Sequence, residues 1–233
     1  MVVRAAAEPN DVRTRSLAAA TRLFAERGFD GTTIQLIADE VGVTKPAVLH
    51  HFPSKEDLRR AVLEGILEHW REVLPRLLLA ATASHDRFDA VFGELHRFFA
   101  ADANRARLVA RELFDRPAEV RQMLRGAVRP WFGAIAAYIK EGQAHGRHWE
   151  DVDPEAYVVH VLQLVVCATA AESVCRVALE PDGERTPEQD AESRQRYDRE
   201  LARIARASLF KPAPAGRTAR AADASSGLRV KGK

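Results

Sequence analysis

The segment 32–58 constrains the fold most strongly, because its residues mark where helices begin and end. Its apolar residues recur at i, i+3, i+4 and i+7, the spacing of one buried helical face: Ile34, Ile37, Ala38 and Val41. Thr32 is a candidate N-cap, and Gln35 stands three residues later, where it would complete a capping box. Gly42 follows the last apolar position, where glycine most easily adopts the positive φ that ends a helix. The pattern predicts a short helix that ends in a tight turn.

A second short helix is expected directly after this turn. Thr44 is its candidate N-cap, and Pro46 falls in its first turn, where a missing N–H costs nothing. Ala38 is small at the point where the two helices must approach each other. Two short helices joined by a glycine turn form a helix-turn-helix, which places its second helix in the major groove of DNA. We predict this unit over about residues 33–52.

The rest of the chain shows helical periodicity and no convincing alternating strand pattern, so we predict an all-α fold of about nine helices. A first helix is expected over 11–27, ending at Gly28. Ser54 should cap a long helix that Pro75 kinks or ends. The remaining helices are expected at 86–101, 105–114, 117–141, 154–179 and 187–210. These elements predict a DNA-binding domain at 10–70, a helical domain at 71–211 and a disordered basic tail at 212–233.

Charge does not identify a nucleic-acid-binding protein here. Apolar residues make up 46% and charged residues 29% of the chain, as in ordinary soluble globular proteins. The net charge of +2 divides into +5 for residues 211–233 (six basic, one acidic) and −3 for the rest (29 basic, 32 acidic). Residues 1–60 carry nine basic and eight acidic side chains. The helix-turn-helix prediction therefore depends on the apolar pattern and not on electrostatics.

A cytoplasmic location is expected. The N-terminus shows no signal pattern, and the most apolar segment, 157–171, is shorter than a membrane span and predicts a buried helix rather than an anchor. Cys167 and Cys175 lie eight residues apart in one predicted helix, roughly 12 Å at the helical rise, which is too far for a disulfide. We expect reduced, buried thiols, and a redox switch across a dimer interface is the alternative.

Enzymatic activity has no support in the sequence. The chain contains no glycine-rich phosphate loop, no Gly-x-Ser-x-Gly elbow and no metal-ligand spacing. His50 and His51 are adjacent, but neighbours on a helix point about 100° apart and would not easily share an ion. We therefore predict a protein that is not an enzyme, with no catalytic residue, no cofactor and no metal.

Three stretches resemble the TetR family of bacterial transcriptional regulators: LFAERGFDGTT (23–33), IADEVGVTK (37–45) and HHFPSKEDL (50–58). Together they cover 29 of the 61 residues 10–70, and the C-terminal half resembles the family only in its helix order. The resemblance implies a homodimer that binds a palindromic operator, usually as a repressor. It also implies that a small molecule entering the C-terminal body releases the DNA.

The same resemblance places the recognition helix at 44–50. The hydroxyls of Thr33 and Thr44 and the exposed helix N-termini suit phosphates, and Lys45 and Lys55 offer charge to the DNA backbone. Gln35 and His50 can form hydrogen bonds with phosphates or base edges, and Ala47 can contact a thymine methyl. Leu49 stands where the family usually has a tyrosine that touches the DNA backbone, and Pro46 stands where glycine is common. The implied DNA-binding residues are Thr33, Gln35, Thr44, Lys45, Pro46, Ala47, Leu49, His50 and Lys55.

The effector and dimer sites are expected in the C-terminal helices. A ligand pocket uses a few polar groups on apolar walls, and such groups here are His96, Trp131, Tyr138, His160 and Gln163. Core or dimer packing is the alternative for each of them. The apolar helices predict a hydrophobic or aromatic effector that enters between 86–101, 117–141 and 154–179 and shifts the helix that follows Ser54. Helices 154–179 and 187–210 should form a four-helix bundle with a second copy.

Two other functions remain open from the sequence. The first is a dimeric protein that binds or sequesters a small molecule without reading DNA specifically, which Leu49 and the near-neutral N-terminal charge would suit. Steep salt dependence of DNA binding without sequence preference would favour it. The second is an enzyme that uses a cavity in the C-terminal body, which turnover assays would reveal.

Overall fold

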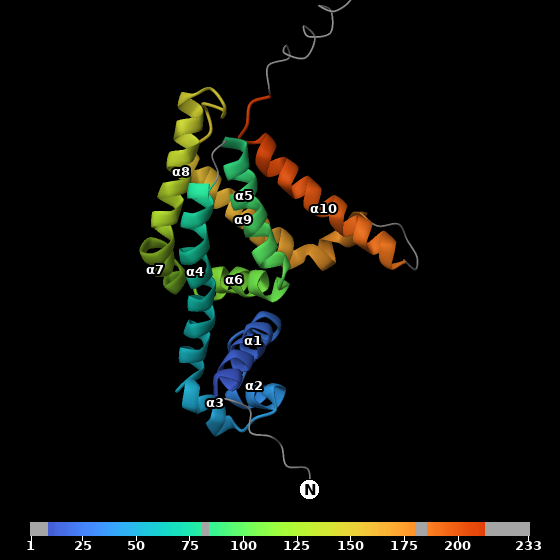
Figure 1. Cartoon of the computed structure of the whole chain (residues 1–233). Coiled ribbons are helices and arrows are strands. Elements are labelled where there is room, and N and C mark those ends of the chain that lie inside the picture. Colours follow the sequence, from blue (N-terminus) through green and yellow to red (C-terminus); the bar gives the residue numbers. More distant parts are fainter. Residues whose placement is uncertain (1–8, 81–83, 180–185, 213–233) are drawn as a thin grey trace, which may run out of the picture.

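The computed structural model describes residues 9–80, 84–179 and 186–212, and this part of the chain contains helices and no β-strand (Figure 1). The all-α prediction is confirmed. Residues 213–233 of the predicted tail lie outside the described residues. The α-helices are α1 (Pro9–Arg27), α2 (Ile34–Val41), α3 (Lys45–His51), α4 (Lys55–Ala80), α5 (Ser84–Ala100), α6 (Ala103–Asp115), α7 (Pro117–Met123), α8 (Arg129–Ala144), α9 (Pro154–Cys175) and α10 (Pro187–Ala207).

The first three helices and the start of α4 surround a small hydrophobic core of their own. Phe24, Ile37, Val48 and Leu58 contribute one side chain each from α1, α2, α3 and α4, and all are almost completely buried. These residues occupy the apolar positions of short amphipathic helices, which gain stability mainly by packing their apolar faces together. The core fixes the helix-turn-helix against α1 and α4.

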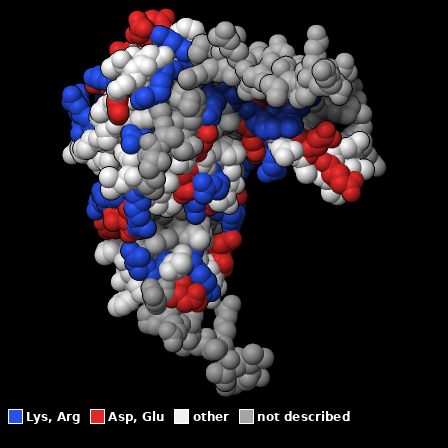
Figure 2. Space-filling view, turned by 45° about the horizontal axis from the view of Figure 1, so that its top comes forward, with Lys and Arg blue, Asp and Glu red and all other residues white. Residues whose placement is uncertain are grey.

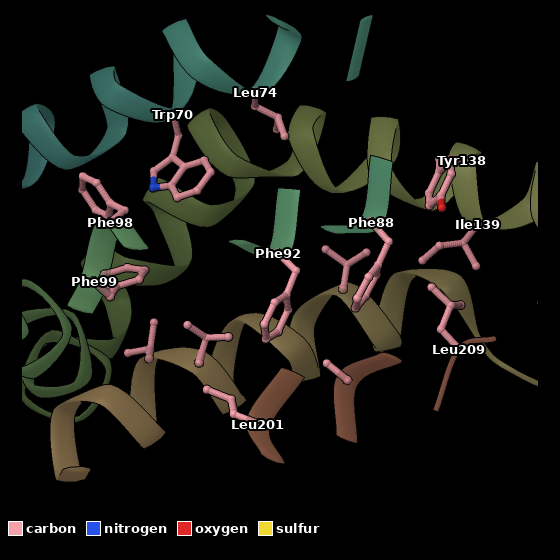
Figure 3. Packing of buried hydrophobic residues seen from close by; sticks show 14 of the residues in the cluster. Trp70, Leu74, Phe88, Phe92, Phe98, Phe99, Tyr138, Ile139, Leu201 and Leu209 are labelled. Carbon is pink, nitrogen blue, oxygen red and sulfur yellow. The ribbon is translucent and has the colours of Figure 1, made fainter. Parts of the chain in front are cut away.

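A second and larger core fills the body formed by the other helices. It is rich in aromatic side chains, and Figure 3 shows Trp70, Phe88, Phe92 and Tyr138 converging from α4, α5 and α8. Leu201 adds a side chain from α10. Because α4 contributes to both cores, it joins the N-terminal helices to this body (Figure 1).

Proline does not end α4, contrary to one of the two outcomes expected from the sequence. The helix continues through Pro75 to Ala80. Pro75 removes only one backbone hydrogen bond, and Leu74 and Leu78 pack against the body on both sides of it. Tertiary packing therefore holds the helix together across the proline.

The helix expected at 117–141 is interrupted by a π-helical segment. α7 runs into the π-helix Leu124–Val128, which continues directly into α8. Such single π turns occur frequently at functional sites, because they strain the regular hydrogen-bond ladder.

The expectation that α9 is a buried helix is correct for one face only. Val158, Val165 and Val166 are buried in the body core, whereas Cys167 and Cys175 are exposed free thiols. This corrects the prediction of buried cysteines: they lie on the opposite face of the same helix. In the described part of the chain, Pro154–Leu179 is long and apolar enough to cross a membrane by length and composition alone, and 22% of its most apolar window is buried.

The N-terminal helices meet the body where α1 packs against α6. Arg111 of α6 donates from Nε to the carbonyl of Ala25 (2.8 Å) and from Nη2 to that of Glu26 (3.2 Å). These carbonyls lie in the last turn of α1, where unpaired acceptors and the negative end of the helix dipole favour a cation. The α1–α6 contact thus joins the two cores.

Candidate DNA-binding and effector sites

The helix-turn-helix has the geometry that its sequence predicts. Gly42 ends α2 with φ 74°, and its N–H points to the carbonyls of Ala38 and Asp39. Ala38 on α2 and Val48 on α3 have no exposed surface, so the two helices approach closely there. The tight turn and the small buried residue fix the angle at which α3 leaves the body of the protein.

Most side chains predicted to contact DNA are exposed at the starts of α2 and α3. Thr33 and Gln35 are exposed in the first turn of α2, and Thr44 and Lys45 are exposed at the start of α3. On α3, Pro46 and His50 are also exposed, while Ala47 and Leu49 are half-buried. The exposed backbone N–H groups and hydroxyls at two helix N-termini suit DNA phosphates.

The capping roles differ from those expected. Thr33, and not Thr32, caps α2: its Oγ1 accepts a bond from the N–H of Leu36 at 3.1 Å. Thr32 is buried, and its hydroxyl donates to the carbonyls of Leu23 and Gly28 at 3.1 and 2.8 Å. Thr44 occupies the N-cap position of α3 without a side-chain cap bond. The sequence predicted that this hydroxyl caps the helix, but the structure shows no such hydrogen bond.

Lys55 is placed differently from a phosphate-binding lysine. Its ammonium donates to the carbonyls of Phe29 (2.8 Å) and Thr32 (2.9 Å) and lies 4.0 Å from the centre of the Phe29 ring. The two hydrogen bonds use two of the three N–H donors of the ammonium, and the ring attracts its charge. In this structure Lys55 fixes the turn before α2, and its contact with a DNA phosphate stays a prediction.

The surface around the helix-turn-helix is not strongly basic. Figure 2 shows Lys and Arg interspersed with Asp and Glu over the visible face.

Leu49 is half-buried and packs against the N-terminal core. Its side chain offers no hydrogen bond to DNA, so the contact that a tyrosine would make there is replaced by packing.

A cavity of about 190 Å³ lies inside the C-terminal body. Almost all of its lining is apolar, and Figure 3 shows several of the side chains that point into this region. Trp131 and Tyr138 of the predicted effector residues line it. The other main contributors, which sequence reasoning did not assign to a pocket, include Trp70, Leu74, Phe88, Phe92, Leu124 and Val128. These residues are apolar and lie on helices, and nothing in the sequence separates a cavity wall from a filled core.

Three predicted effector residues lie elsewhere. The side chain of His96 is turned towards α10, where its Nε2 lies 3.1 Å from a carboxylate oxygen of Asp198. His160 and Gln163 are exposed on the outer face of α9. The search for polar groups on apolar helices therefore found two residues of the cavity, Trp131 and Tyr138, and missed the others because most of its wall is apolar.

Tyr157 adds a polar group at the cavity wall. Its hydroxyl donates to the carbonyl of Ala205 at 2.6 Å, which ties α9 to α10. Burial raises the pKa of this phenol above its usual value. Tyr157 therefore stays neutral and serves as a hydrogen-bond donor rather than as an acid.

Comparison with known proteins decides the family. Residues 17–62 match the model of bacterial regulatory proteins of the tetR family. The HTH-type transcriptional repressor KstR2 of Rhodococcus jostii is 33% identical over 155 residues, which cover 61% of this chain and 71% of the repressor. The chain belongs to the TetR family. This TetR-family protein is a DNA-binding transcriptional regulator.

Solved structures of TetR-like fold agree over almost the whole chain. The ketosteroid transcriptional regulator KstR2 of Mycobacterium tuberculosis covers 90% of this chain and 100% of its own, with a TM-score of 0.62 and 21% identity. FadR from Bacillus subtilis, solved with stearoyl-CoA, covers 84% of this chain and 99% of its own, with a TM-score of 0.59 and 16% identity. At these identities the likeness shows that this TetR-family chain shares their fold.

Proposed function

We propose that the protein is a homodimeric repressor that binds a palindromic operator and is released by a small hydrophobic effector. One observation carries the proposal: α4 belongs to both sites. Leu58 near its start is buried in the core of the helix-turn-helix, and Trp70 and Leu74 further along line the cavity. A ligand that displaces the cavity wall therefore acts on the helix that holds the DNA-binding unit.

The outer face of α9 supports a dimer. Five exposed residues with helical spacing form one stripe along it: Ala156, His160, Gln163, Cys167 and Val174. Val174 is 75% exposed, and Ile204 on α10 is 44% exposed. Exposed apolar side chains grouped on helix faces mark protein–protein interfaces, and a second copy that packs α9 and α10 against its own would cover Val174 and Ile204.

The chemistry of the cavity supports a hydrophobic effector. Its walls are aromatic and aliphatic side chains, and Arg87 is the charged residue that lines it. KstR2 is described as a ketosteroid regulator and FadR was solved with stearoyl-CoA, so both are linked to ligands with a large apolar part. We propose an effector with an apolar carbon skeleton for this protein as well.

The first test is sequence-specific DNA binding. Fluorescence anisotropy would compare the intergenic DNA upstream of the gene with a scrambled duplex. We expect the double variant Lys45→Ala, His50→Ala to lose affinity for the specific duplex by about tenfold or more, the effect of losing a good base contact. A matched variant, Lys140→Ala, His145→Ala, changes the same residue types at exposed positions on α8 and at its C-cap, and should bind like wild type. Equal, weak binding of every duplex by all three proteins would refute specific regulation.

The second test is release by a ligand. A ketosteroid and a long-chain acyl-CoA would be screened for a rise in melting temperature and for release of operator DNA. A compound that stabilises the protein and releases DNA supports the proposal. Stabilisation without specific DNA binding, together with a steep salt dependence, would favour a protein that only binds or sequesters the compound.

A further inference from the structure

The turn between α1 and α2 is held by cations from both parts of the molecule. The Phe29 ring centre lies 4.0 Å from Lys55 Nζ, 4.3 Å from Arg116 Cζ and 5.8 Å from Arg59 Cζ. Lys55 and Arg59 belong to α4, whereas Arg116 lies at the junction of α6 and α7. Partly desolvated cations over an aromatic ring attract it appreciably. We call these four side chains the Phe29 joint.

Carboxylates fix the two arginines of the joint. Arg59, 5% exposed, pairs with Glu56, with the buried Glu112 and with Glu119. Arg116 Nη1 lies between Glu56 (3.1 Å) and Glu119 (3.0 Å). Although partial burial opposes it, hydrogen bonds from Arg116 and Arg59 lower the pKa of Glu119, so this carboxylate stays ionised. Glu119 bridges both arginines, so its loss would remove one of the carboxylates that neutralise each of them.

Glu119 also lies next to the wall of the cavity. It belongs to α7, whose last residue Met123 lines the cavity, and the π-helical residues Leu124 and Val128 line it too. The cavity holds about 190 Å³, less than the roughly 300–1,000 Å³ of typical ligand pockets. A ligand of that size held wholly inside the cavity would move part of the wall. The π turn is the part where the backbone hydrogen-bond pattern is already irregular.

We propose that the signal of an occupied cavity reaches the helix-turn-helix through α7 and the Phe29 joint. This inference rests on the proposed effector-released regulator. Displacement of α7 carries Glu119 away from Arg59 and Arg116, which loosens the joint around Phe29. Lys55 holds the carbonyls of Phe29 and Thr32 at the two ends of this turn, directly before α2. The loosened turn then frees α2 and α3 from their DNA-binding position.

This coupling makes Phe29, Arg59 and Arg116 positioning residues for α3, because none of them needs to touch DNA. An occupied cavity weakens DNA binding only if the effector prefers the state with the loosened joint. Hydrogen exchange of residues 28–52 reports the state of the joint in the absence of DNA. The readout therefore does not depend on knowing the operator or the effector.

The test compares two substitutions singly and together. Glu119→Gln removes the charge that bridges the arginines, and Leu124→Phe enlarges a side chain in the π segment as a substitute for an occupied cavity. Each should accelerate exchange across 28–52 by about tenfold, within the usual range of coupling between sites. The double variant should exchange no faster than either single one, because both act on the same joint. Glu72→Gln, on an exposed α4 carboxylate, should exchange like wild type.

Two results would overturn the inference. One is a double variant whose increase in exchange rate equals the product of the two single increases, which would mean that the cavity acts by another route. The other is unchanged exchange in Glu119→Gln. If Leu124→Phe lowers the melting temperature enough to obscure exchange, Leu124→Met gives a milder change of shape at the same position. Failure of operator binding by wild type would refute the proposed function and leave this exchange experiment intact.

Discussion

At the scale of single residues, Lys45 and Lys55 lie close together in the sequence but differ in what their ammonium groups contact. Lys45 is exposed at the start of α3, while Lys55 uses its ammonium on two carbonyls and the ring of Phe29. Both carry one charge and both stand in segments that resemble DNA contacts. Only the three-dimensional environment separates a lysine that can reach a phosphate from one that fixes the protein.

The two lysines should therefore give opposite signatures. We expect Lys55→Ala to lower the free energy of unfolding by ~1–3 kcal/mol, because it leaves the part-buried carbonyls of Phe29 and Thr32 without a charged donor. It should leave the salt slope of DNA binding unchanged. Lys45→Ala should keep the stability and reduce that slope by about one unit for the lost phosphate contact. Chemical unfolding and titrations at several salt concentrations measure both quantities. A reduced slope for Lys55→Ala would show that its ammonium turns to DNA in the complex.

At the scale of elements, local signals predicted the helices well and tertiary effects accounted for the differences. Gly42 and Ser54 mark helix ends because caps are local interactions. Pro75 did not end α4, because packing on both sides of it outweighs one missing hydrogen bond. The cavity could not be predicted, since an apolar stripe looks the same whether it faces a filled core or a void. The π segment between α7 and α8 gave no recognised sequence signal either.

The contact between α5 and α10 should depend on pH. The hydrogen bond to Asp198 raises the pKa of His96 above 6.5, against an opposing effect of burial, and Glu172 adds to the rise. A raised folded-state pKa means that the protonated form stabilises the fold below about pH 6.5 and that this contribution is lost as the pH rises through the folded-state pKa. As the pH rises from about 6.5 through the folded-state pKa of His96, we expect the free energy of unfolding of wild type to fall. That of His96→Gln should fall less.

Chemical unfolding at a series of pH values tests this contact, because each unfolding free energy can be compared across the window. His145→Gln changes an exposed histidine at the end of α8 and serves as the control, with a pH profile like wild type. Identical profiles for His96→Gln and wild type would show that the tie to Asp198 contributes nothing to folding.

At the scale of the whole molecule, the described residues form two hydrophobic cores joined by α4 and by the α1–α6 contact, with the outer face of α9 exposed to solvent. The TetR resemblance predicted this order of parts from residues 23–58. It predicted little about the C-terminal body, because the sequences of those helices indicate an amphipathic pattern and little else. The body therefore holds most of what the structure adds.

The open face of α9 leads to a prediction about assembly. The double variant Cys167→Arg, Val174→Arg places two charges on this face and should convert a dimer into a monomer, because unpaired charges are costly in an apolar interface. Sedimentation velocity measures the mass of each species. Leu79→Arg alters an 85% exposed leucine on α4 and should leave the mass unchanged. A double variant that remains dimeric would move the interface away from α9.

The length of α4 has a geometric consequence. Its 26 residues extend for about 39 Å at the helical rise. If the helix tilts as a rigid rod about its cavity end, a rotation of about 5° moves its first turn by about 3 Å, which is the length of one hydrogen bond. Two recognition helices in a dimer must match half-sites at a fixed spacing, so a small angular change deep in the body becomes a mismatch at the DNA.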